Sequence, residues 1–86
     1  MAKTFFPSAN KTIFVKASQP HPENTEYKIS IGLEQWDDGN HEVVKIQMVY
    51  NGEVAGRRSP SYPIGTDDFQ RVCRKTEELM ASSNKA

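Results

Sequence analysis

Residues 27–36 have the sequence YKISIGLEQW, in which apolar and polar side chains alternate as far as Leu33. A β-strand points successive side chains to opposite faces, so this alternation predicts a strand with one buried face. The apolar positions that share this face are Tyr27, Ile29, Ile31 and Leu33. Trp36 breaks the alternation, and therefore either faces the other side of the strand or follows a bulge.

Turn residues and a second alternating stretch follow this strand. Residues 37–40 are DDGN, which is typical of a turn, and residues 44–50 alternate again. Asn51-Gly52 is the preferred dipeptide of a two-residue type I′ hairpin. The sequence therefore predicts two successive antiparallel hairpins.

The second hairpin also predicts a register. If Tyr50 pairs with Glu53, then Lys45 faces Arg58 across the hairpin, and cross-strand partners share a face of the sheet. We expect this pair to lie on the side away from the hydrophobic layer. Lys28 and Gln47 join them there if the second and third strands are neighbours.

The two ends of the chain complete the predicted fold. Residues 12–17 are β-branched and aromatic, which favours a first strand, whereas residues 1–10 have no clear period and are expected to form a loose arm. Thr66 is expected to cap a C-terminal helix whose apolar stripe includes Phe69, Val72, Cys73 and Leu79. Residues 82–86 are expected to be a frayed tail. We predict one α+β domain over residues 1–86, with a four-stranded antiparallel meander followed by one C-terminal helix.

Composition limits the classes of function. The chain has 86 residues, with eleven basic and eleven acidic side chains, so a strongly basic, non-specific nucleic-acid binder is disfavoured. Cys73 is the only cysteine, which excludes an intrachain disulfide, and the absence of a membrane segment and of a signal-peptide core predicts a cytoplasmic protein. Neither histidine has a ligand-spaced partner, so no metal or cofactor is expected.

Enzyme activity is not expected. Cys73 falls on the apolar stripe, where a small core residue is more common than a nucleophile. Two alternative functions remain open. The more favoured is a protein–protein interaction module that uses the helix or an exposed sheet edge and binds no nucleic acid. The less favoured is a thiol-dependent enzyme that uses Cys73.

Basic and aromatic residues favour a different function, single-stranded nucleic-acid binding. Such proteins combine a cationic surface with aromatic faces on which bases stack. The candidate binding residues are Lys28, Trp36, Lys45, Gln47, Tyr50, Arg57 and Arg58. A structural explanation competes with this one, because any soluble domain carries Lys and Arg on the outer face of a half-exposed sheet.

The order of features over residues 31–79 resembles the transcriptional positive-cofactor-four family. The similar parts are Leu33 with Trp36, residues 44–50 ending in Tyr50, Gly56-Arg57-Arg58, and the Thr66-Asp67-Asp68-Phe69 helix start. Residues 59–63 (SPSYP) interrupt the pattern, because the family passes directly from its basic pair to the step before the helix.

The resemblance implies a four-stranded antiparallel sheet with a helix, dimerisation through the helices, and single-stranded DNA on the concave sheet face. Arg57 and Arg58 match the basic element after glycine, Tyr50 matches an aromatic of the central strand, and Lys45 with Gln47 matches its polar contacts. The implied dimer and core surface comprises Phe69, Val72, Cys73 and Leu79. The resulting expectation is a homodimer that binds single-stranded DNA with little sequence preference, with RNA as an open alternative ligand.

Overall fold

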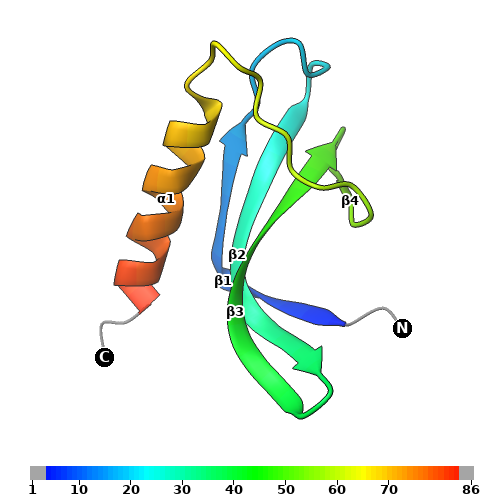
Figure 1. Cartoon of the computed structure of the whole chain (residues 1–86), viewed down its shortest axis with the longest axis vertical. Coiled ribbons are helices and arrows are strands. Elements are labelled where there is room, and N and C mark those ends of the chain that lie inside the picture. The colour runs from blue at the N-terminus through cyan, green and yellow to red at the C-terminus, as the bar shows by residue number, and fades with distance from the viewer. Residues whose placement is uncertain (1–3, 84–86) are drawn as a thin grey trace.

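The computed structural model describes residues 4–83, which form four strands and one helix (Figure 1). The elements are β1 (Phe5–Lys16), β2 (Thr25–Trp36), β3 (Gly39–Tyr50), β4 (Glu53–Ala55) and α1 (Asp68–Ser83). The strands pair antiparallel in the order β1-β2-β3-β4. The predicted α+β meander with a C-terminal helix is therefore confirmed.

Strand β2 carries the centre of the hydrophobic core. Tyr27 and Ile29 are fully buried and Ile31 is nearly so, which confirms the predicted buried face. These side chains pack with Val72 and Leu79 of α1. The β2–β3 register runs without interruption to Trp36, so Trp36 faces the side opposite the helix rather than following a bulge.

The β3–β4 hairpin confirms one part of the predicted register and corrects another. Asn51 and Gly52 both have positive φ (52° and 83°), as a type I′ turn requires, and Tyr50 pairs with Glu53. However, β4 ends at Ala55, and the Arg58 N–H donates to the Ala55 carbonyl across a new turn (3.1 Å). The prediction that Lys45 faces Arg58 is wrong, because the chain leaves the sheet before the two residues can pair.

Strand β1 is longer than expected. It begins at Phe5, so residues 5–10 belong to the sheet and are not a loose arm. Residues 8–11 interrupt the register between Pro7, which pairs with Gly32, and Thr12, which pairs with Ser30. A Cβ at Gly32 would overlap the Phe6 carbonyl oxygen, so glycine is what allows this part of β1 to lie against β2.

Helix α1 covers one face of the sheet. It packs on β1 and β2, and Figure 1 shows the β2–β3 hairpin extending past its C-terminal end. The Thr66 hydroxyl accepts the Asp68 N–H (3.3 Å), as predicted for a cap, and the helix continues to Ser83. Residues 84–86 of the predicted frayed tail lie outside the described residues.

Two residues of the expected dimer surface belong to the core of a single chain. Val72 (1% exposed) and Leu79 (7%) are buried against the sheet, so they are not available to a second copy. Phe69 is half exposed and Cys73 partly exposed. Over residues 4–83, no helix has the length and hydropathy needed to span a bilayer.

Candidate functional site

The sheet face opposite α1 is hereafter called the open face. A row of three side chains crosses it, because Phe14 of β1 pairs with Lys28 of β2, which pairs with Gln47 of β3. The next row contains Thr12, Ser30 and Lys45. The structure therefore brings Lys28, Lys45 and Gln47 together, as the alternation of β2 and β3 predicted.

Phe14 is the functional candidate that sequence reasoning missed. Its side chain is 53% exposed at the β1 end of the row, while its neighbour Val15 is buried in the core. The signal was present in the sequence, because strand parity places Phe14 opposite Ile13 and Val15. Sequence reasoning used this aromatic residue only as evidence for a first strand.

Lys45 has partners of its own on the open face. Its ammonium group forms an ion pair with Glu34 and lies 5.4 Å from the centroid of the Phe5 ring. Glu34 also accepts the Trp36 indole N–H (2.8 Å). Lys45 is therefore partly neutralised before any ligand arrives.

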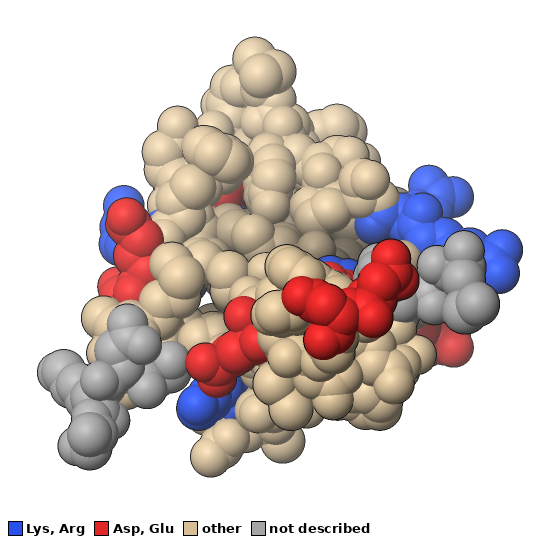
Figure 2. Space-filling model, turned by 60° about the horizontal axis from the view of Figure 1, so that its bottom comes forward, with Lys and Arg blue, Asp and Glu red and all other residues tan. Residues whose placement is uncertain are grey.

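Trp36 lies at the hairpin end of the open face. Its ring is 43% exposed and is tilted against the His41 ring, with 4.3 Å between centroids. The surroundings are acidic, since Asp37, Asp38 and Glu42 are exposed near this end, and Figure 2 shows Asp and Glu side chains gathered across the front of this view. The hydrogen bond from His41 lowers the pKa of Asp38, which keeps that carboxylate charged. Trp36 is consequently a weaker candidate for an anionic ligand than Phe14.

Three predicted site residues lie away from the open face. Tyr50 pairs with Thr25 on the helix-facing side of the sheet, and Arg57 and Arg58 follow the end of β4. The Arg58 guanidinium lies 5.9 Å from the centroid of the Tyr50 ring. Tyr50 and Arg58 also line a groove with residues of two loops, so they form a second location and do not extend the first.

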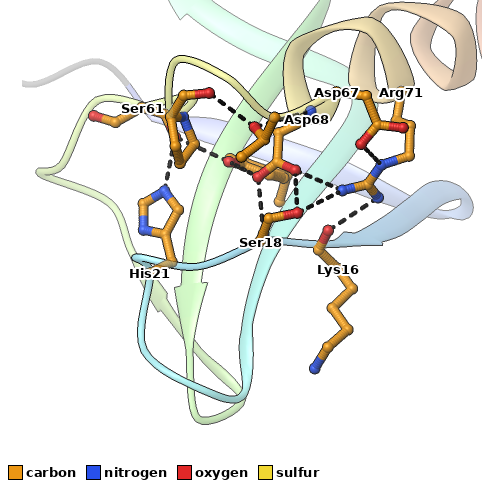
Figure 3. Close-up of polar contacts among 10 residues, drawn as sticks. Lys16, Ser18, His21, Ser61, Asp67, Asp68 and Arg71 are labelled. Carbon is orange, nitrogen blue, oxygen red and sulfur yellow. Dashed lines mark hydrogen bonds and ion pairs between the residues drawn. The ribbon is translucent and has the colours of Figure 1, made fainter.

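A buried carboxylate joins three segments at the start of the helix (Figure 3). Asp68 has no exposed surface, and it accepts the backbone N–H (2.8 Å) and hydroxyl (2.6 Å) of Ser18 from the β1–β2 loop. It also accepts the Tyr27 hydroxyl of β2 (2.8 Å) and the Arg71 guanidinium of α1 (2.6 Å). Each oxygen of Asp68 therefore accepts hydrogen bonds from two donors.

These contacts fix the charge states of the network. Burial opposes the ionisation of Asp68, but the hydrogen bonds from its partners outweigh it and lower the pKa of this carboxyl to about 2. Burial and the hydrogen bond to Asp68 raise the pKa of Tyr27, so its hydroxyl keeps its proton. Each of these polar groups has a hydrogen-bond partner within the network, which ties the β1–β2 loop, β2 and the start of α1 together.

Within residues 4–83, no cluster of three or more His, Cys, Asp or Glu side chains could hold a metal ion. Cys73 is partly exposed on α1 beside the core. Comparison of the chain with protein-family models, with curated proteins and with solved structures finds no match.

Proposed function

We propose that this protein binds single-stranded nucleic acid on the open face, with DNA as the expected ligand. The observation that carries the proposal is the row formed by Phe14, Lys28 and Gln47 across three neighbouring strands. It combines an exposed aromatic ring, a cation and an amide on one face of the sheet. Single-stranded nucleic acids are bound by this combination of stacking, phosphate pairing and hydrogen bonding.

Phe14 would supply the stacking surface. A ring that is half exposed on the face away from the helix gains little from the core, whereas a base stacked on it contributes about 1–3 kcal/mol. Every base has a flat face, so stacking on Phe14 accounts for binding with little sequence preference.

The charges of the open face predict weak, salt-sensitive binding. Its lysines are Lys16, Lys28 and Lys45, and Glu26 and Glu34 lie on the same face. Three phosphate contacts to a single strand correspond to a slope of about −2 in a plot of log affinity against log salt concentration. The neutral net charge of the chain is consistent with this small number of contacts.

The test is a titration of the protein with a fluorescent oligothymidylate at two salt concentrations. Lys28→Glu should weaken binding by about tenfold or more, because one phosphate contact is replaced by repulsion. Arg74→Glu is the matched control, since it makes the same charge change at an exposed position of α1. Equal losses in the two variants, or no binding by the unmodified protein, would reject the proposal.

A second candidate function is protein–protein interaction, and an apolar patch on the helix-facing side of the sheet supports it. Phe6 (53% exposed) pairs with Leu33 (46%), and Val44 (37%) lies diagonally beside Leu33 on β3. Met80 of α1 is also exposed (37%). A second copy of the chain that covered this patch would form a homodimer, but through the sheet and not through the helix surface expected from the sequence.

Sedimentation of the unmodified protein and of a Leu33→Lys variant tests the interaction patch. A dimer that dissociates in the variant supports the interaction patch, and unchanged oligothymidylate binding by that variant separates the patch from the open face. A monomer at all accessible concentrations would reject the dimer.

A further inference from the structure

A groove of about 610 Å³ lies on the molecule away from the open face. Its walls come from the β1–β2 loop, the end of β3 and the segment between β4 and α1, and the lining side chains are largely aromatic rings and prolines. The residues that the following argument uses are His21, Tyr50, Arg58, Ser61 and Tyr62. Its volume is in the range that small-molecule sites occupy.

The walls of the groove are held in place before any ligand binds. The Ser61 carbonyl accepts the His21 Nε2–H (2.8 Å) and the Tyr27 hydroxyl (2.9 Å). Figure 3 shows Ser61 and His21 beside the Asp68 network. The Tyr62 ring stacks on Tyr27 with 5.0 Å between centroids. Because Tyr27 is fully buried, these contacts connect both loop walls to the core. A preformed wall lowers the ordering cost of binding.

The chemistry of the lining indicates an anion with a flat ring. Tyr50 and Tyr62 offer aromatic surface, and Arg58 is the cation of the groove, with its guanidinium beside the Tyr50 ring. None of the described lining residues is Asp or Glu. Arginine is well suited to phosphate because its planar fork donates two parallel hydrogen bonds.

We infer that the groove binds one nucleotide, with its phosphate on Arg58 and its base against Tyr50 and Tyr62. The nucleotide is either free in solution or part of a strand that also contacts the open face, and only the second source rests on the proposed function. Tyr50 faces the helix side of the sheet, so this site is separate from the row at Phe14.

The first experiment follows the aromatic NMR signals of the protein during titration with thymidine 5′-monophosphate. The His21 and Tyr62 signals should shift, and uncharged thymidine should bind at least about tenfold more weakly, because it lacks the phosphate that pairs with arginine. Absence of shifts at millimolar nucleotide, or equal affinity for thymidine, would overturn the inference.

Two neighbouring arginines provide the variant and its matched control. Arg58→Gln should weaken nucleotide binding about tenfold, whereas Arg57→Gln should not, because Arg57 is exposed outside the groove lining. Equal losses in both variants would indicate unspecific charge attraction and would overturn the site.

Oligothymidylate then separates the two sources of the nucleotide. If Arg58→Gln also weakens oligonucleotide binding, the groove holds part of the strand, and if it does not, the groove holds a free nucleotide. Either result supports the site. Failure of Lys28→Glu to affect the oligonucleotide would remove the open-face proposal and leave the mononucleotide result standing.

Discussion

Phe14 lies directly opposite Lys28 in the β1–β2 register, and its ring is 53% exposed on the face that α1 leaves uncovered. If bases stack on this ring, its shape matters more than its hydrophobicity. Phe14→Leu keeps apolar bulk but removes the flat surface, and it should weaken oligothymidylate binding by about tenfold, which is within the range of one stacking contact. Phe14→Tyr should bind like the unmodified protein. Equal binding by the leucine variant would show that no base stacks there.

Glu34 reduces the positive charge of the open face by pairing with Lys45. Glu34→Gln removes one negative charge and frees the ammonium group, so oligothymidylate affinity should rise about three- to fivefold at low salt. Glu42→Gln is the control, because Glu42 lies on the helix-facing side of β3, where it pairs with Lys11 (3.8 Å). A gain of the same size in the control would indicate a general effect of net charge.

Asp68 should make stability depend on pH in the acid range. Its pKa is about 2 in the folded protein, below the value of about 3.9 for an unfolded chain, so its stabilisation is complete above about pH 5. The stabilisation is lost as the pH falls towards 2. Asp68→Asn should lower the free energy of unfolding by about 3 kcal/mol at neutral pH. Urea unfolding should show that the difference in unfolding free energy between the variant and the unmodified protein becomes smaller below pH 4.

A milder variant covers the case in which Asp68→Asn does not fold. Ser18→Ala removes one hydroxyl donor to the same carboxylate and should lower the free energy of unfolding by about 1 kcal/mol. This difference from the unmodified protein should also become smaller in acid. A gap that stays constant down to pH 2 would contradict the assigned charge state.

Gly32 should tolerate no side chain. A Cβ there would overlap the Phe6 carbonyl oxygen, so Gly32→Ala should push the first residues of β1 off the sheet at a cost of about 1–3 kcal/mol. Hydrogen exchange should accelerate most at the amides of residues 5 and 6. Gly56→Ala is a suitable control, because a Cβ at Gly56 meets no atom within 4 Å.

Local patterns explain which parts of the fold were predictable. The alternation of β2 and the Asn51-Gly52 turn each depend on neighbouring residues, and both were confirmed. The first half of β1 gave no periodic signal, because residues 8–11 loop out of the register and the strand is held by pairing with distant residues of β2. The alternating pattern also did not reveal that β4 ends at Ala55. The turn from Ala55 to Arg58 competes there with continued pairing to β3.

The candidate site was predictable to the same extent. Strand parity correctly placed Lys28, Lys45 and Gln47 on one face. It could not reveal that Lys45 pairs with Glu34, or that Arg58 lines a groove with His21, because those contacts depend on how loops and side chains settle in three dimensions.

The shortness of β4 has a consequence for how copies of this protein meet. β4 accompanies β3 only from Met48 to Tyr50, so among the described strands the outer edge of β3 from Gly39 to Gln47 has no neighbour. Such an edge offers backbone donors and acceptors to any extended chain that approaches it. Glu42 and Lys45 place charges along this edge, and charged side chains are a common safeguard against sheet-to-sheet aggregation. A variant without the charges of Glu42 and Lys45 should therefore form ordered aggregates in concentrated solution more readily than the unmodified protein.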